Sequence, residues 1–153
     1  MLRLAPIGFL TVAAIGVASV PLIAGPVDTM HVRKDGYHAM GAAFKAATDT
    51  LRGDTARIDT IRQSAVVIRK VSRAQYGWFP AGSGPRPGVK TAAKAEIWSK
   101  AADFRARQDA FARQADVFFH AAAGNDVAVM RSEARKLGAT CKGCHDNFRE
   151  SDD

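Results

Sequence analysis

Four stretches of the chain place apolar residues at the spacing of a helix that is buried along one side. In the clearest of them, which follows Thr91, the seam positions recur at alternating intervals of four and three residues. A seam of such a and d positions packs against neighbouring helices. Its members are Ile97, Ala101, Phe104, Gln108, Phe111, Ala115 and Phe118. The pattern predicts a long helix with a single buried face.

The other three stretches repeat this rhythm. The first begins at about Asp28 or Thr29, a candidate N-cap pair, the second follows Asp54 and Thr55, and the last begins near Asp126. Their seams are Met30, Tyr37, Phe44 and Leu51; Ile58, Ile61, Ala65, Ile68 and Val71; and Met130, Ala134, Leu137, Cys141, Cys144 and Phe148. Each stretch is therefore predicted to form a helix with one apolar face.

The connections between these helices set their order in space. Gly53 separates the first pair and Gly124-Asn125 the last pair, and both breaks are short. Residues 77–88 between the second and third helices are rich in glycine and proline, which predicts a long loop. Because short connections join antiparallel neighbours, the expected fold is all-α, an up-down-up-down antiparallel four-helix bundle.

The first residues of the chain have the character of a leader. Arg3 precedes a stretch from Ile7 to Ala24 that carries no charge, which is typical of a secretory signal peptide. We expect residues 1–25 to be removed after Ala24 or Gly25, leaving residues 26–153 as a single domain. An uncleaved membrane anchor is the alternative, since this stretch is long enough to span a bilayer. In either case the domain is predicted to be exported.

Charge narrows the classes of partner. The chain of 153 residues has a formal net charge of +7, but its basic residues are dispersed and form no block. We therefore predict no binding to nucleic acid. The positive charge would suit an acidic redox partner, although it could equally serve the solubility of long helices.

The last predicted helix carries the chemistry. It contains Cys141-Lys142-Gly143-Cys144-His145, a C-x-x-C-H run. Each thiol of such a run can add to one vinyl group of a haem, and the histidine can ligate the iron. The run therefore predicts one covalently bound haem c, with His145 as a ligand of the iron.

Other uses of the two cysteines fit less well. A thioredoxin-like site needs a βαβ context, and nothing in the sequence reads as a strand. A structural zinc site needs two further ligands at close spacing, whereas the other histidines are scattered. A disulfide between residues three apart on a helix would give His145 no role.

The helical spacing places the haem inside the bundle. Cys141, Cys144 and His145 share one helix face with Leu137 and Phe148, which we expect to point inward. The second axial position of the iron must then be reached from the seam of another helix. Tyr37 and Met40, three residues apart, are both candidates. Methionine would give a low-spin electron carrier and tyrosine a five-coordinate iron, and spacing does not choose between them.

Several runs of residues resemble the cytochromes c′. The segment from Arg33 to Gly41 is similar to the first-helix motif of that family, and residues 78–83 resemble the loop after its second helix. Ile97-Trp98 resembles the start of its third helix. The C-x-x-C-H run with Phe148-Arg149 resembles its C-terminal end. The resemblance covers residues 28–150, and that family consists of four-helix bundles.

The resemblance implies a role for each matching residue. Arg33 becomes the partner of a haem propionate, Tyr37 the residue on the distal side, and Arg149 a neighbour of the proximal His145. Low-spin relatives of the family carry methionine where this chain has Tyr37, so the resemblance favours a five-coordinate iron. Met40 is then a packing residue.

These features together predict a periplasmic cytochrome that is not an enzyme. Its high-spin haem would transfer one electron, bind NO or CO, or do both, and its redox partner is not indicated. The resemblance leaves a homodimer open. One alternative is a low-spin carrier with methionine and histidine ligands. Another is a haem-free helical bundle held by a disulfide.

Overall fold

The computed structural model describes residues 26–151, with side chains from residue 28 onward. Five α-helices and one short 3₁₀ helix make up this part of the chain. They are α1 (Pro26–Arg52), α2 (Ile58–Ala74), η1 (Gln75–Gly77), α3 (Glu96–Ser99), α4 (Ala101–Ala123) and α5 (Val127–Phe148). Four of these helices are long, as the four apolar seams predicted.

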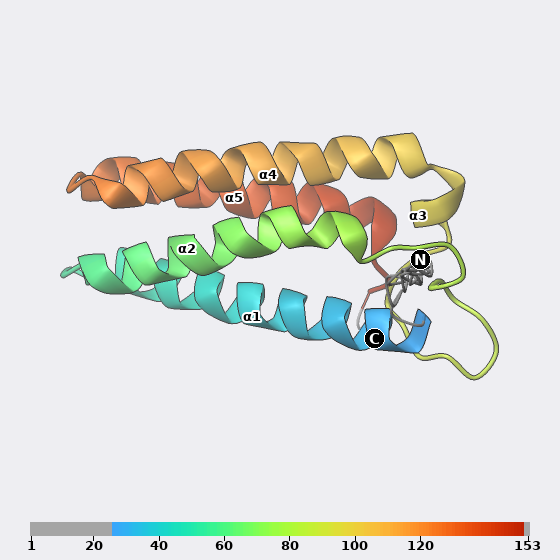
Figure 1. The fold of residues 1–153 in the computed structure, drawn as a ribbon. Coiled ribbons are helices and arrows are strands. Elements are labelled where there is room, and N and C mark those ends of the chain that lie inside the picture. Colours follow the sequence, from blue (N-terminus) through green and yellow to red (C-terminus); the bar gives the residue numbers. More distant parts are fainter. Residues whose placement is uncertain (1–25, 152–153) are drawn as a thin grey trace, which may run out of the picture.

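The long helices form an antiparallel bundle that runs up, down, up and down (Figure 1). The short connections after α1 and after α4 lie at one end, and the long loop with α3 lies at the other. α1 packs on α2, α2 on α4, and α4 on α5, whereas α1 and α5 contact each other much less. The predicted all-α, four-helix architecture is confirmed.

The seam residues form the core. The main cluster of buried residues draws on all four long helices and consists of Ala47, Leu51, Ile61, Ala65, Ile68, Phe111, Ala115, Phe118, Ala122, Met130, Ala134 and Leu137. A second cluster of Ile97, Phe104 and Phe148 lies at the loop end of the bundle. Burial of these apolar side chains is what holds the helices in register.

The third helix begins later than its pattern predicts. Residues after Thr91 are not helical until Glu96, and the helix breaks again at Lys100 before α4 begins. The reason is tertiary: Lys94 N–H donates to the carbonyl of Phe148 at 3.1 Å, so this segment pairs with the C-terminal end of the chain. Ala101, predicted as a seam position, is consequently exposed at the helix start.

Of the N-caps predicted for the first and last helices, one is wrong and one is confirmed. α1 is already helical at Pro26, so Asp28 and Thr29 do not cap it. Asp126, in contrast, is the N-cap of α5, and its side chain accepts hydrogen bonds from the N–H groups of Ala128 and Val129. The cap fixes where α5 begins and therefore which of its faces carries the cysteines.

The predicted leader falls outside this description. Within residues 26–151 no helix is both long and apolar enough to cross a bilayer. The stretch from Ile7 to Ala24 lies outside the described residues, so cleavage and anchoring both stay predictions.

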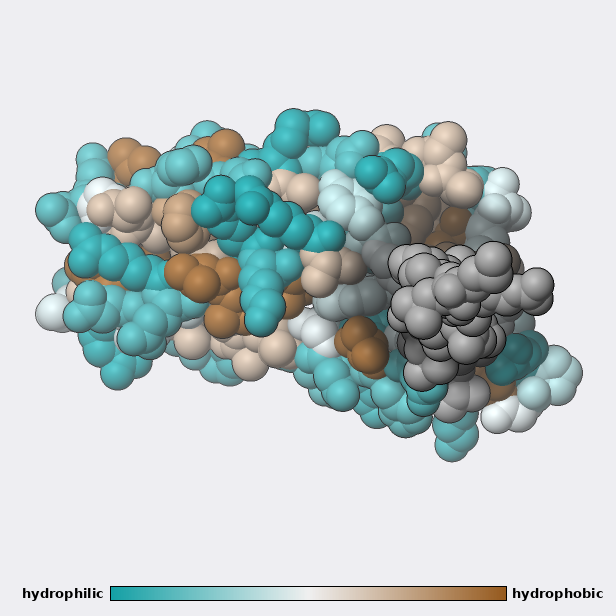
Figure 2. Space-filling view, in the orientation of Figure 1, coloured by the Kyte–Doolittle hydropathy of each residue, from teal (hydrophilic) through white to brown (hydrophobic). Residues whose placement is uncertain are grey.

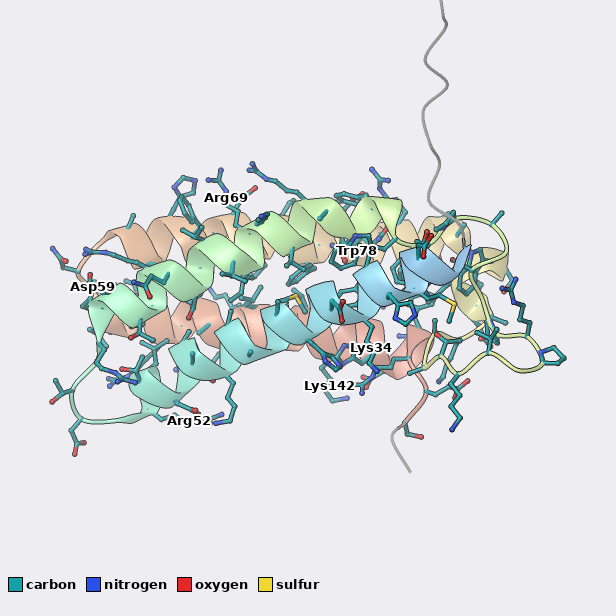
Figure 3. All side chains as sticks on the ribbon, turned by 60° about the horizontal axis from the view of Figure 1, so that its bottom comes forward. Lys34, Arg52, Asp59, Arg69, Trp78 and Lys142 are labelled. Atoms are coloured by element: carbon teal, nitrogen blue, oxygen red, sulfur yellow. The ribbon has the colours of Figure 1, made fainter. Side chains whose placement is uncertain are left out.

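Trp78 packs against α1 at the loop end of the bundle (Figure 3). Its indole ring lies directly over Gly36, where a Cβ atom would come within 2.6 Å of Trp78 Cζ2. A glycine inside a helix is normally unfavourable by about 1 kcal/mol relative to alanine. Gly36 is therefore explained by the close approach of this ring.

We predict that Gly36→Ala lowers the free energy of unfolding by about 1–2 kcal/mol, because displacing Trp78 costs more than the gain in helix propensity. Denaturant unfolding followed by circular dichroism measures the change. Asp35→Ala, at the exposed neighbouring position, is the control and should stay within about 0.5 kcal/mol of the unmodified protein. A Gly36→Ala protein as stable as the control would contradict this interpretation.

Candidate functional site

Three of the predicted site residues, Met40, Cys141 and His145, lie together between the long helices. A cavity of about 130 Å³ opens there. It is lined by Met40, Gly41 and Phe44 of α1, Ile68 of α2, Phe111 of α4, and Leu137, Cys141 and His145 of α5. Apart from His145, its polar groups are few, as in many cofactor sites.

The two cysteines lie on the same side of α5. Both are half-buried: Cys141 packs against the main core, and Cys144 against the cluster at the loop end. Both thiols are free, so no disulfide joins them. The reading of a bundle held by a disulfide is therefore wrong for this structure.

The surroundings of both cysteines disfavour the thiolate form. Burial raises the pKa of both, and the nearby Cys141 helps to raise the pKa of Cys144 to about 11. Among the described residues no group of three or more His, Cys, Asp or Glu side chains could hold a metal ion.

His145 lines the cavity beside Cys141, although much of its side chain is exposed. It lies in the last turn of α5, and its carbonyl accepts a hydrogen bond from Arg149 N–H at 3.1 Å. Arg149 is the first residue beyond the helix and has an exposed side chain and extended backbone, bridged to Ala93. The structure thus places Arg149 one turn past His145, as the spacing requires.

Arg33 is the most constrained of the predicted residues. It is only 6% exposed, and its guanidinium reaches from α1 into the loop after η1. Nε donates to the carbonyl of Trp78 at 3.1 Å, and Nη2 donates to the carbonyl and the hydroxyl of Ser83 at 2.9 and 3.0 Å. The guanidinium also lies 4.4 Å from the centre of the Phe79 ring, a cation–π contact.

One nitrogen of this group has no partner. Among the described residues, Nη1 of Arg33 is the one buried side-chain nitrogen or oxygen without a hydrogen-bond partner. An unpaired buried donor of this kind signals a missing partner. Burial lowers the pKa of Arg33, an effect that an adjacent carboxylate would offset. A haem propionate supplies such a carboxylate, so the residues present fit a haem.

Tyr37 lies one turn further along α1. Its ring meets Trp78 edge to face, with ring centres 5.0 Å apart. Its hydroxyl donates to Oε1 of Gln75 at 3.2 Å. Burial, aided by the proximity of Cys144, raises the pKa of the phenol, and Arg33 only partly opposes this. Tyr37 is therefore a neutral phenol close to the haem-attachment residues.

The structure separates the two candidates for the distal side. Met40 lines the cavity with Cys141 and His145 and packs against the main core. Tyr37 does not line it and lies instead on the Arg33 side of the seam, among Trp78 and Phe79. The two predicted neighbours are thus held in different surroundings.

Sequence reasoning missed two residues that support this site. Ser83 accepts from Arg33, and its own hydroxyl donates to the carbonyl of Pro80 at 2.8 Å. Gln75 accepts from Tyr37. Ser83 lies in a glycine- and proline-rich run, where polar residues are expected to face solvent. Gln75 could have been found from its spacing. It follows Val71 by four residues, so it continues the buried face of α2 with a polar side chain, and a polar residue at such a position indicates a buried hydrogen bond.

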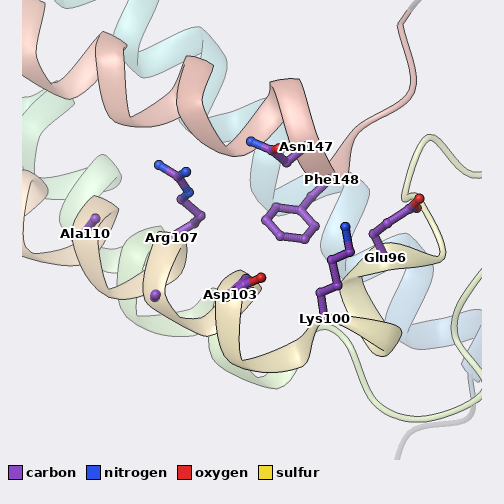
Figure 4. Close-up of a pocket in the computed structure, with 8 residues that line it drawn as sticks. Glu96, Lys100, Asp103, Arg107, Ala110, Asn147 and Phe148 are labelled. Carbon is purple, nitrogen blue, oxygen red and sulfur yellow. The ribbon is translucent and has the colours of Figure 1, made fainter.

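A larger and more open pocket lies on the other side of α5 (Figure 4). It has a volume of about 350 Å³ and lies between α3, the first half of α4 and the end of α5. Arg107 and Phe148 project into it from α4 and α5. Both acidic and basic side chains line it, and it contains neither Cys141 nor His145, so it is separate from the candidate site.

A thiol and an imidazole that line an apolar cavity, with a second thiol three residues from the first on the same helix of a four-helix bundle, define a helical c-type haem protein. Comparison with known proteins agrees. The chain belongs to the cytochrome c′ family, whose profile matches residues 28–149. Proteins of this family carry one covalently bound haem c, so the predicted family and cofactor are confirmed, and the haem-free alternative is wrong.

Individual relatives give the same result. Cytochrome c′ from Pararhodospirillum photometricum is 34% identical over 128 residues, which cover 83% of this chain and 100% of that protein. The solved cytochrome c′ from Thermochromatium tepidum is 25% identical, with a TM-score of 0.79 over 84% of this chain and 98% of that one. A nitric oxide complex of a variant of cytochrome c′ from Alcaligenes xylosoxidans is 27% identical, with a TM-score of 0.76 over 85% and 99% of the two chains.

The hydrogen bonds of the Arg33 guanidinium lead to a first prediction for the site. Arg33→Met should lower the free energy of unfolding by about 2–4 kcal/mol, because it leaves the buried carbonyls of Trp78 and Ser83 without donors. Arg33→Lys should recover less than half of this loss, since an ammonium cannot reproduce the planar fork. Lys34→Met, one residue along and exposed, is the control. Equal stability of Arg33→Met and this control would contradict the role.

The buried phenol of Tyr37 generates a second prediction. Its pKa is raised in the folded state above the usual value of about 10, so above pH 10 the unfolded chain loses this proton first. The stabilisation is therefore complete below about pH 10 and is lost as the pH rises. Tyr37→Phe should reduce the alkaline slope of the unfolding free energy by roughly 1.4 kcal/mol per pH unit.

Tyr76→Phe provides a matched comparison for this measurement. The pKa of Tyr76 is also raised, by burial and by its hydrogen bond to Asp109, but its phenol is less deeply buried than that of Tyr37. Its removal should change the slope less. Identical pH dependence of the unmodified and Tyr37→Phe proteins would disprove the assignment.

Proposed function

We propose that this protein is an exported, periplasmic cytochrome whose haem iron is high-spin and is ligated on the protein side by His145 alone. It binds small diatomic gases, NO and CO, and transfers single electrons, and it turns over no organic substrate. Family membership establishes only a c-type haem protein. The spin state, the gas binding and the export are our proposals.

Each predicted residue has a place in this proposal. Cys141 and Cys144 hold the haem by two thioether bonds, and His145 provides the proximal imidazole. Arg33 pairs with a propionate through Nη1, a charge-assisted hydrogen bond. The haem supplies the iron that takes up a gas or an electron. Arg149 lies one turn beyond His145, on the proximal side of the haem.

The observation that carries the proposal is the neutral phenol of Tyr37. A tyrosine binds iron as a phenolate, and here burial of the side chain disfavours that form. Tyr37 occupies the position where the low-spin relatives have methionine, so the residue at that position does not become a ligand. The sixth position of the iron then stays available to a gas.

The cavity itself suits diatomic ligands. Its walls on α1, α2 and α4 are Met40, Gly41, Phe44, Ile68 and Phe111, whose side chains carry no hydrogen-bond donor. Bound O₂ is polarised and gains from a donor, whereas NO and CO depend on one much less. A similar chain, from Alcaligenes xylosoxidans, has been solved as a nitric oxide complex.

A second function is favoured by one observation. Met40 lines the same cavity as His145 and Cys141, and its thioether could fill the sixth position. The protein would then be a low-spin electron carrier with methionine and histidine ligands, unable to bind gases without losing Met40.

Partners of the protein follow from its surface. Apolar side chains are scattered over the face of α1 and α2 that Figure 2 shows. Val66 and Val67 on α2 and Val32 on α1 are among the exposed apolar residues. We include in the proposal a homodimer that covers this face, since an exposed apolar patch favours association. The net positive charge of +7 would steer an acidic redox partner.

Optical and electron paramagnetic resonance spectra of the holoprotein test the choice of ligand. We predict a high-spin ferric form with no methionine-to-iron charge-transfer band, and a ferrous form that binds CO. Met40→Leu, which keeps the volume nearly constant, should retain both properties, because Met40 is packing rather than a ligand. A low-spin ferric spectrum that becomes high-spin in Met40→Leu would establish the second function instead.

A further inference from the structure

A polar network crosses the otherwise apolar loop end of the bundle. The hydroxyl of Tyr37 donates to Oε1 of Gln75, which is the first residue of η1 and only 4% exposed. Gln108 on α4 is 5% exposed and lies against the same residue. Buried polar side chains are uncommon unless their hydrogen bonds are satisfied, and here the satisfied set links α1, η1 and α4.

The orientation of the Gln75 amide is determined by its neighbours. Nε2 donates to the carbonyl of Ser72 at 3.1 Å and to the carbonyl of Gln108 at 3.4 Å. The opposite orientation would set Oε1 against two carbonyl oxygens, which cannot donate. Oε1 therefore faces Tyr37 and accepts from it.

The position of Gln75 is fixed as well. Nε2 of Gln108 donates to the main-chain carbonyl of Gln75 at 3.3 Å, so each glutamine holds the backbone of the other. The ring of Tyr37 is held in turn by its edge contact with Trp78. An acceptor held this firmly keeps the phenol proton in one direction.

We infer that Gln75 is a positioning residue that keeps the single hydrogen-bond donor of Tyr37 turned away from the gas-binding side of the haem. This rests on the gas-binding function proposed above and deepens it. A diatomic ligand then meets no donor from Tyr37, and the protein discriminates against O₂, which a donor would stabilise, while NO and CO are little affected. Selectivity thus depends on a residue that need not touch the ligand.

The test uses the CO complex of the ferrous holoprotein as its probe. Gln75→Met keeps the length of the side chain but removes the acceptor, which releases the hydroxyl of Tyr37 to donate to CO. We expect a lower C–O stretching frequency in the infrared spectrum and CO dissociation up to about fivefold slower, the worth of one neutral hydrogen bond. In Gln75→Met combined with Tyr37→Phe, the shift caused by Gln75→Met should disappear.

A matched control separates this effect from general loosening. Ser72→Ala removes a buried hydroxyl that donates to the carbonyl of Arg69, yet it keeps the main-chain carbonyl that binds Gln75. The C–O frequency of this control should not change. An unchanged frequency in Gln75→Met, or a shift that persists without the hydroxyl of Tyr37, would overturn the inference.

A second measurement needs no change at Gln75 and decides the matter if that variant fails to fold. The tyrosine doublet in the ultraviolet resonance Raman spectrum reports whether a phenol donates or accepts. The difference between the unmodified holoprotein and Tyr37→Phe isolates Tyr37 from Tyr76. A donor signature supports the inference, and an acceptor signature overturns it.

The outcomes also separate the two levels of the proposal. If neither the unmodified protein nor any variant binds CO, the gas-binding function is wrong and the role of Gln75 falls with it. If all of them bind CO with the same frequency, the gas-binding function stands and only the role of Gln75 is wrong.

Discussion

The buried guanidinium of Arg33 is the interaction on which the loop end of the bundle depends. It joins α1 to Trp78 and Ser83 by three hydrogen bonds and stacks on Phe79. A glycine- and proline-rich loop has little hydrophobic surface with which to hold its own shape, so a multidentate donor from a long helix provides the order. The one unpaired nitrogen, Nη1, shows that this arrangement is complete only with a further acceptor.

The seam between α1 and α5 is the second constraint. Three of the contacts between neighbouring long helices are extensive, whereas the fourth, between α1 and α5, is sparse and lies beside a cavity lined by Cys141 and His145. A bundle of this kind gains burial from whatever fills the seam, so the cofactor contributes to folding as well as to chemistry. The cap at Asp126 fixes the start of α5 and thereby the face on which both thiols lie.

Much of this could be predicted from the sequence because helical periodicity is a local signal. The four long helices, their order and the haem-attachment run of Cys141 to His145 needed only spacing. The late start of the third helix could not be predicted, since it results from Lys94 pairing with the carbonyl of Phe148. The roles of Gln75 and Ser83 were likewise hidden. Each depends on a partner more than thirty positions away, and no local pattern records such a contact.

The contacts of Arg33 and the cavity between α1 and α5 together determine how Tyr37 and Met40 are placed. The two residues lie three apart on α1, so a modest rotation of the helix would exchange which of them faces the iron more directly. Arg33 opposes such a rotation, because turning α1 would break its hydrogen bonds to Trp78 and Ser83. Gly36 opposes it as well, since only its bare backbone lets the Trp78 ring lie against the helix. Contacts at the end of α1 thus fix the rotation of the helix and, with it, which of its side chains line the cavity. With α1 held in this way, Met40 lines the cavity and Tyr37 lies beside it, against Trp78.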